Sequence, residues 1–284
     1  ASGARLINGD RMWHYNEGLV NWNPVWTDHG IRILPGPSSL WLDGGGNRLP
    51  APFFPGFDTL GTLAHLRGTG HDHSWFVLTQ QVIEKEFALS GSEQNPDLTG
   101  KSIPLLLKRV LPGAPGPVEA FKKFGADFVV ASSVDELVEG MNRIAPEGVI
   151  EVEKLRALIV EHDVHALAEN PSDPQQQAIR RAREYLGDKL IQVAPPHAFA
   201  DPRYGPLIAV KLHTLTRKTL GGLETDLSAR CLRPDGSVLT GLYAAGEAAG
   251  FGGGGMHGYN ALEGTFLGGC LFSGRTAGRA AATQ

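Results

Sequence analysis

The residues best suited to chemistry gather near the end of the chain. Glu247 follows the small-residue run 241–246, and His257 and Tyr259 lie in the glycine-rich loop after it. A carboxylate can accept hydrogen bonds from sugar or ribityl hydroxyls, while an imidazole or a phenol can move a proton. Glycines between a strand and a helix let backbone N–H groups approach a flat, anionic cofactor. The sequence therefore predicts a cofactor-binding segment in this region.

Predicted strands and a closing helix surround this segment. Small and apolar residues predict a buried strand over 241–245, and the run 264–282 predicts a helix. Strands are also predicted over 207–212 and 229–233. The last section, 206–284, is therefore expected to be a strand-bearing unit.

The middle section, 74–205, is mainly helical by its pattern. Apolar side chains spaced by three and four predict a helix over 74–90. Ser133 and Glu136 have the spacing of a capping box, which predicts a helix that starts at Ser133. The further predicted helices cover 118–124, 152–167 and 173–186. This section is therefore inserted between two glycine-rich, strand-bearing ends of the chain.

The first section, 1–73, is rich in tryptophan, proline and glycine. Strands are predicted over 30–34 and 39–43, and the glycines at 44–46 indicate a hairpin turn. Four tryptophans are expected to pack in the core: Trp13, Trp22, Trp26 and Trp41. Together the three sections predict an α+β fold in which a helix-rich module is flanked by strand-bearing segments.

Composition excludes several classes of partner. The 284 residues carry a net charge of −4, which argues against nucleic acid and anionic membranes as partners. No uncharged apolar run approaches the ~20 residues that span a bilayer. Cys231 and Cys270 are isolated, which fits a reducing compartment and predicts a cytoplasmic protein.

The C-terminal sequence resembles a known family. Its blocks are similar, in order and spacing, to the C-terminal half of the succinate dehydrogenase/fumarate reductase flavoproteins and the 3-ketosteroid dehydrogenases. The blocks are Leu220-Gly221-Gly222, Asp235-Gly236, Gly241–Glu247, His257-Gly258-x-Asn260-x-Leu262-x-Gly264 and Gly274-Arg275-x-Ala277-Gly278.

This resemblance implies an FAD-dependent oxidoreductase. It implies that 206–284 completes part of a glutathione-reductase-like FAD-binding domain, that 74–205 is a capping domain for a small-molecule substrate, and that 1–73 leads into the cap. It also implies that Glu247 binds hydroxyls of FAD. The other implied cofactor-binding residues are Gly246, Asn260, Ala261, Phe266 and Leu267.

The backbone N–H groups of Phe266 and Leu267 match those that face the flavin pyrimidine edge in the family. They lie at a predicted helix start, where the helix dipole favours negative charge on a reduced flavin. By the same resemblance, His257 and Tyr259 lie near the isoalloxazine ring as candidate catalytic residues. For each of the two, a structural role remains an open alternative.

Departures from the family pattern narrow the class of substrate that the resemblance implies. In the fumarate reductases an arginine follows the counterpart of Asn260, whereas this chain has Ala261. Arg217 and Lys218 replace a histidine pair and remain candidate binders of a carbonyl or carboxylate. The pair of cationic contacts that would bind a dicarboxylate is therefore incomplete. The expected substrate is a neutral, larger ketone or enone. The implied reaction moves a hydride between a substrate C–C bond and flavin N5.

A metal centre is not predicted. His71-Asp72-His73 alternates in the manner of a metal-binding pair on a strand, but no third ligand lies nearby in the sequence.

The segment that should bind the adenosine half of FAD is not found in this chain. Complete family members begin with a βαβ unit that carries Gly-x-Gly-x-x-Gly. We therefore expect this chain to be a fragment that has the missing N-terminal segment as a partner, that binds FAD weakly alone and that is inactive alone. The alternative is a non-catalytic fragment that uses the glycine-rich loop as a structural or anion-binding module.

Overall fold

The computed structural model describes residues 3–34, 36–90, 100–104, 113–250 and 265–283. These form two compact units. The terminal unit comprises Ala1–His14 and Thr216–Gln284, and the central unit comprises Tyr15–Leu215. The chain passes between the units inside strands β2 (Met12–Leu19) and β7 (Leu207–Thr219). The predicted helical section 74–205 falls inside the central unit.

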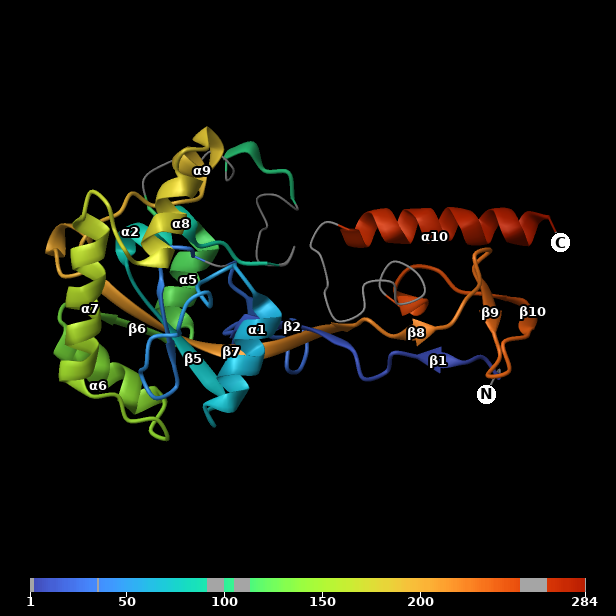
Figure 1. Ribbon diagram of the computed structural model, residues 1–284, viewed down its shortest axis with the longest axis horizontal. Coiled ribbons are helices and arrows are strands. Elements are labelled where there is room, and N and C mark those ends of the chain that lie inside the picture. Colours follow the sequence, from blue (N-terminus) through green and yellow to red (C-terminus); the bar gives the residue numbers. More distant parts are fainter. Residues whose placement is uncertain (1–2, 35, 91–99, 105–112, 251–264, 284) are drawn as a thin grey trace. The chain divides into compact units, whose positions relative to one another are not determined.

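A six-stranded sheet built around β7 organises the central unit (Figure 1). Its strand order is β3-β2-β7-β5-β4, and β6 also pairs with β7. The pairings of β4 with β5, β5 with β7 and β6 with β7 are antiparallel. The remaining strands are β3 (Ile31–Arg32), β4 (Leu40–Asp43), β5 (His73–Thr79) and β6 (Phe128–Ala131).

The helix predicted over 74–90 is wrong in its first half. Residues His73–Thr79 form β5, in which every residue is buried, and helix α2 (Gln80–Glu86) follows. A strand buried on both faces is a continuous apolar run, and such a run also satisfies a spacing of three and four. Pairing with β4 and β7 decided the conformation of this segment.

Helices cover the sheet and complete one hydrophobic core. The fully buried side chains of this core include Trp75 and Phe76 from β5, Leu137 and Met141 from α6, and Leu155 from α7. The predicted cap at Ser133 is confirmed, because Ser133 Oγ accepts the Glu136 N–H at 3.2 Å. The box is not reciprocal as predicted, because the Glu136 carboxylate accepts the N–H and hydroxyl of Ser132 instead of the Ser133 N–H. The helices around this core are α1 (Thr59–Gly68), α5 (Gly116–Phe124), α6 (Val134–Ile144), α7 (Val152–Leu167), α8 (Pro174–Ala182) and α9 (Leu186–Ile191).

The four tryptophans divide between core and surface. Trp13 and Trp41 are buried, as predicted, but Trp22 and Trp26 are 41% and 60% exposed. Trp26 stacks on His29 and Trp22 contacts Phe121 and Phe124, so both lie over the surface of the central unit rather than in its core. The predicted core position of these two residues is therefore wrong.

In the part of the terminal unit that the structure describes, two short antiparallel pairs accompany one long helix. Strand β1 (Leu6–Ile7) pairs with β8 (Gly222–Leu223), and β9 (Arg230–Leu232) pairs with β10 (Val238–Tyr243). The buried strand predicted over 241–245 is corrected by β10, which begins earlier and has no fully buried residue. Helix α10 (Thr265–Ala282) matches the predicted closing helix.

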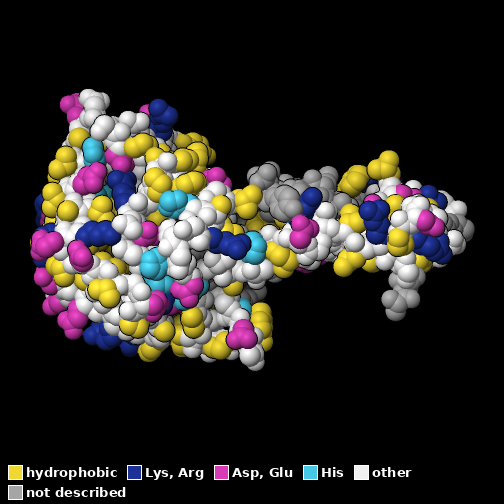
Figure 2. All heavy atoms as spheres, turned by 60° about the horizontal axis from the view of Figure 1, so that its bottom comes forward, with side chains coloured by type: hydrophobic (Ala, Val, Ile, Leu, Met, Phe, Trp, Pro, Cys, Tyr) yellow, Lys and Arg dark blue, Asp and Glu magenta, His cyan; other side chains and the backbone are white. Residues whose placement is uncertain are grey.

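Surface charge in the structure is mixed. On the face shown in Figure 2, acidic and basic side chains are interspersed over the central unit. Among the residues that the structure describes, none of the helices combines the length and apolarity that crossing a bilayer requires.

Glu86, at the end of α2, ties three segments together. Its carboxylate accepts the Ser38 N–H at 2.8 Å, the Ser38 hydroxyl at 2.6 Å and the Ala194 N–H at 2.7 Å. Burial raises the pKa of Glu86 to about 7 despite these donors.

A raised pKa makes stability depend on pH. Because the folded protein holds this proton more tightly than the unfolded chain, the contribution is complete below about pH 4.5 and is lost as the pH rises to about 7. The expected decrease in the free energy of unfolding is about 3 kcal/mol. Urea unfolding across this range should show the decrease in wild type and in Glu84→Gln but not in Glu86→Gln. An equal slope in Glu86→Gln would refute the assignment.

Candidate functional site

Gly246 lies where β10 leads into the short 3₁₀ helix η2 (Gly246–Ala248). Its φ is +61°, and a Cβ there would lie 3.2 Å from Cys270 Sγ on α10. Its N–H donates to Ser273 Oγ at 2.9 Å, so η2 is fixed against the second and third turns of α10. Glycine is required here both for the left-handed backbone and for the close approach.

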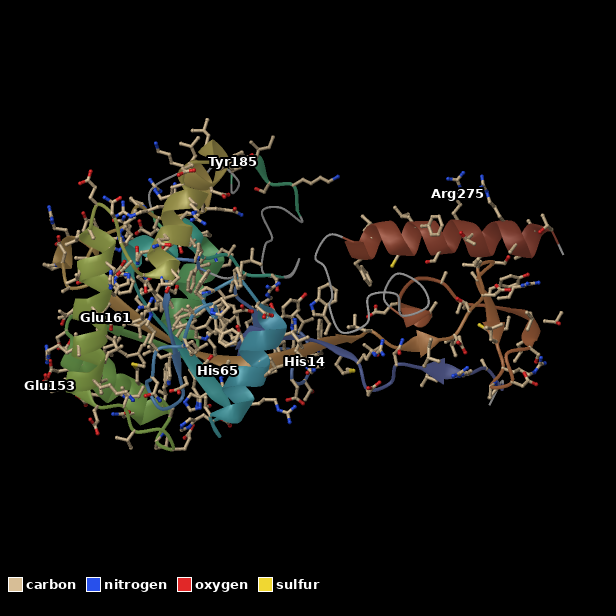
Figure 3. The ribbon with its side chains drawn as sticks, in the orientation of Figure 1. His14, His65, Glu153, Glu161, Tyr185 and Arg275 are labelled. Carbon is tan, nitrogen blue, oxygen red and sulfur yellow. The ribbon has the colours of Figure 1, made fainter. Side chains whose placement is uncertain are left out.

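Glu247 follows on η2 with an exposed carboxylate. Among the described residues it has no hydrogen-bond partner. Phe266 and Leu267 lie in the first turn of α10, and Leu267 is 67% exposed. In Figure 3, Arg275 of α10 points away from the strands that lie below the helix.

The remaining predicted site residues are only partly described. His257, Tyr259, Asn260 and Ala261 lie outside the described residues. Arg217 and Lys218 lie near the end of β7, and their side chains are not described. Their roles therefore stay predictions.

The described part of this segment fits a flavin nucleotide. Gly246 leaves its own backbone without a side chain, and Glu247 supplies an exposed carboxylate, the acceptor that ribityl or ribose hydroxyls require. Phe266 and Leu267 lie in the first turn of α10, where the helix dipole favours negative charge.

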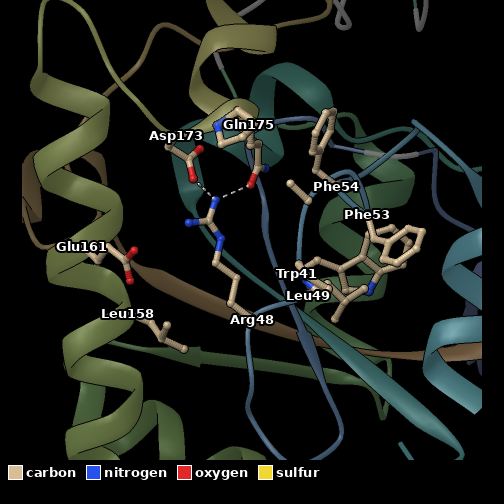
Figure 4. Close-up of a pocket in the computed structure, with 12 residues that line it drawn as sticks. Trp41, Arg48, Leu49, Phe53, Phe54, Leu158, Glu161, Asp173 and Gln175 are labelled. Carbon is tan, nitrogen blue, oxygen red and sulfur yellow. Dashed lines mark hydrogen bonds and ion pairs between the residues drawn. The ribbon is translucent and has the colours of Figure 1, made fainter. Parts of the chain in front are cut away.

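A cavity of about 300 Å³ lies in the central unit, and its centre is Arg48 (Figure 4). The guanidinium Nη2 lies 2.7 Å from Asp173 Oδ2 and 3.1 Å from Gln175 Oε1. Gln175 is itself fixed, because its amide donates to the carbonyls of Pro37 and Ser39. The other lining residues are Trp41, Leu49, Pro50, Ala51, Phe53, Phe54, Leu158, Glu161 and Pro174.

Most residues that line this cavity are apolar, and the positive charge of Arg48 is already paired with a carboxylate. Asp173 is 9% exposed and pairs with Arg48, and Glu161 adds a second carboxylate from α7. A dicarboxylate would therefore meet no uncompensated cation here, whereas the aromatic wall suits a neutral apolar molecule.

The Arg48–Asp173 pair also holds α8 to the turn after β4. We expect Arg48→Met to lower the free energy of unfolding by about 2 kcal/mol, because it leaves a largely buried carboxylate unpaired. Urea denaturation measures this. Arg156→Met, which removes an exposed pair with Asp135, is the control and should barely change the midpoint. Equal midpoints for both variants would contradict the assignment.

The fold adds a third candidate ligand to Asp72 and His73, because Glu147 presents a ligand atom within 4.8 Å of theirs. His73 Nε2 is buried with no hydrogen-bond partner among the described residues, so the ring proton sits on Nδ1 and is donated to Asp72 Oδ1 at 2.9 Å. Lys211 Nζ lies 3.2 Å from Glu147 Oε1. The group is an ion-pair network that already contains its own cation.

The sequence interpretation did not find the Arg48 cavity. Arg48 directly follows the glycine turn at 44–47, and nothing local in the sequence connects it to Asp173 or to α7. The available signal was the cluster of prolines and phenylalanines that follows Arg48, which supplies apolar lining residues of the cavity. The cluster is Pro50, Pro52, Phe53 and Phe54.

Comparison with known proteins identifies the family. The sequence model described as FAD binding domain matches residues 1–267. The chain is 60% identical over 282 residues to a KsdD-like steroid dehydrogenase of Mycobacterium tuberculosis, covering 99% of this chain and 50% of the relative. It is also 60% identical over 267 residues to a KsdD-like steroid dehydrogenase of Mycolicibacterium smegmatis, covering 94% of this chain and 49% of the relative.

Solved structures agree with this fold. A 3-ketosteroid delta1-dehydrogenase from Sterolibacterium denitrificans has a TM-score of 0.59 at 15% identity, with 99% of this chain and 44% of that chain covered. A flavocytochrome c3 fumarate reductase has a TM-score of 0.54 at 15% identity, with 99% and 38% covered. The chain belongs to the FAD-binding domain family, and its cofactor is FAD. It spans half the length of the curated relatives it matches.

Proposed function

We propose that this chain is part of an FAD-dependent dehydrogenase that acts on a C–C bond beside a ketone in a neutral, steroid-type molecule. The observation that carries the proposal is the 60% identity, over 99% of the chain, to proteins named KsdD-like steroid dehydrogenases. When FAD is bound, its flavin supplies hydride transfer at N5.

The chain's own residues then bind and orient the cofactor and the substrate. Glu247 accepts hydrogen bonds from FAD hydroxyls, and Gly246 lets the backbone approach the cofactor. The N–H groups of Phe266 and Leu267 stabilise negative charge at the flavin pyrimidine edge. Residues 74–205 form the cap over the substrate, and 206–284 complete a glutathione-reductase-like FAD-binding domain. His257, Tyr259, Arg217 and Lys218 are the candidates for contact with the substrate.

The residue at position 261 supports a neutral substrate over succinate or fumarate. Ala261 replaces the arginine of the fumarate reductases. Removing that arginine removes bidentate recognition of a carboxylate.

FAD binding tests the cofactor part of this proposal. The chain should be titrated with FAD alone and after mixing with the part of the M. tuberculosis relative that it does not match. Flavin fluorescence should be quenched stoichiometrically only in the mixture. A stoichiometric yellow complex of the chain alone would contradict the proposed need for a second segment. A mixture that never binds FAD would favour a non-catalytic module.

A further inference from the structure

A second cavity, of about 380 Å³, lies wholly within the central unit. It is lined by the end of β2, the loop after it and residues 213–215 of β7. Most of its surface is apolar, and none of its lining residues is a lysine or an arginine. The lining residues are Gly18, Leu19, Val20, Asn21, Pro24, Asp28, His29, Gly30, His213, Thr214 and Leu215.

His213 is the lining residue that a buried carboxylate orients. Its Nε2 lies 2.9 Å from Oδ1 of Asp127, and the side chains are 34% and 6% exposed. The other carboxylate oxygen, Oδ2, accepts the Val20 N–H at 2.7 Å. Asp127 is thus fixed at both oxygens, and the pair joins β2, β6 and β7.

This arrangement fixes the tautomer of the histidine. An ionised carboxylate only accepts hydrogen bonds, so Nε2 of neutral His213 must carry the proton. Nδ1 then presents a free lone pair, and no described protein group donates to it. A histidine whose tautomer is set by a buried aspartate is the arrangement of a general base.

The rest of the cavity suits an apolar molecule. Leu19, Val20, Pro24 and Leu215 contribute its apolar surface. Beside it Trp26 stacks on His29 with ring centroids 3.7 Å apart. A neutral ligand with one carbonyl would pack its apolar surface against these side chains and place its carbonyl near the imidazole of His213.

We propose that this cavity binds the ketone substrate and that His213, positioned by Asp127, exchanges the proton on the carbon beside the carbonyl. The inference rests on the proposed dehydrogenase function. In the step, the C–H bond breaks, its electron pair forms the enolate, and the proton bonds to Nδ1 of His213. Return of the proton reverses the step, so exchange with solvent needs no oxidant. Acceptance of a hydride would be the chemistry that FAD supplies when bound.

Asp127→Asn tests the positioning role directly. The asparagine oxygen should keep the Val20 N–H bond, which turns the amide N–H₂ toward His213 Nε2. Because the amide donates, the ring proton must move to Nδ1 and the free lone pair is lost. Long-range ¹H–¹⁵N spectra of histidine-labelled protein at about pH 8, above the ordinary histidine pKa, report the tautomer. His213→Asn identifies the signal.

Exchange supplies the second measurement. In D₂O and without any electron acceptor, the chain should speed deuterium incorporation beside the 3-keto group of 4-androstene-3,17-dione. Mass spectrometry measures this incorporation. We expect Asp127→Asn and His213→Asn to slow the protein-dependent rate about 100-fold, the usual effect of losing a general base. Asp72→Asn, at an exposed aspartate beside another histidine, is the control and should exchange like wild type.

Each outcome decides the proposal. The Nδ1–H tautomer in wild type, no protein-dependent exchange, or unchanged exchange in a folded Asp127→Asn would overturn it. Exchange that requires both residues would support it. If exchange occurs but the FAD-loaded protein is never reduced by a ketosteroid, the dehydrogenase proposal fails while the assignment of His213 stands.

Discussion

Replacing Glu247 with alanine is expected to weaken FAD binding roughly 10- to 100-fold in the complemented protein. The exposed carboxylate of Glu247 has no partner among the described residues, so the proposal assigns both its oxygens to hydroxyls of the cofactor. Hydrogen bonds to a charged group are worth about 1.5–3 kcal/mol, which corresponds to this change in affinity. Glu247→Gln keeps one acceptor and should lie between alanine and wild type.

Titration of FAD into the mixed segments, followed by flavin fluorescence, measures this effect. Asp235→Asn is the matched control, because Asp235 is a turn carboxylate of the same unit whose oxygen is already bound by Ser237. Equal affinities for Glu247→Ala and Asp235→Asn would remove Glu247 from the cofactor site.

Asp163→Ala is expected to lower the free energy of unfolding by about 3–5 kcal/mol. The Asp163 carboxylate on α7 accepts the Phe199 N–H at 2.6 Å, the Ala200 N–H at 2.9 Å and a bond from His162 Nδ1 at 2.9 Å. Burial alone would raise the pKa of Asp163, but these donors outweigh it and lower the pKa. Alanine leaves two backbone N–H groups without their acceptor.

Urea unfolding at neutral pH tests this prediction, with Asp135→Ala as the control at an exposed carboxylate. Because the pKa of Asp163 is lowered in the folded state, its contribution should disappear as the pH falls below the ordinary aspartate range. A loss no larger than that of Asp135→Ala would show that the 163–200 contacts add little to stability.

Local signals predicted the parts of the fold that local sequence determines. The Ser133 cap, the closing helix and the strand at 207–212 each depend on residues close in the chain. The strand His73–Thr79 was misassigned because its conformation follows from two distant partners, β4 and β7. Trp22 and Trp26 were misplaced because hydrophobicity alone does not show which apolar side chains stay on the surface.

The candidate sites show the same division. Gly246 and Glu247 were found because they belong to one continuous motif. The His213–Asp127 pair joins residues 86 positions apart, and the charge of Arg48 is matched by Asp173, the N-cap of α8. No periodicity or spacing reports such pairs, since the β7 sheet and the packing of α8 bring them together.

The reduction of bound flavin under anaerobic conditions tests the account most directly. The FAD-loaded, complemented protein is mixed with a saturated 3-ketosteroid or with succinate, and the flavin absorbance is recorded. The account predicts that the ketosteroid bleaches the flavin and that succinate does not. Bleaching by succinate, or an unchanged spectrum with every ketosteroid, would contradict it.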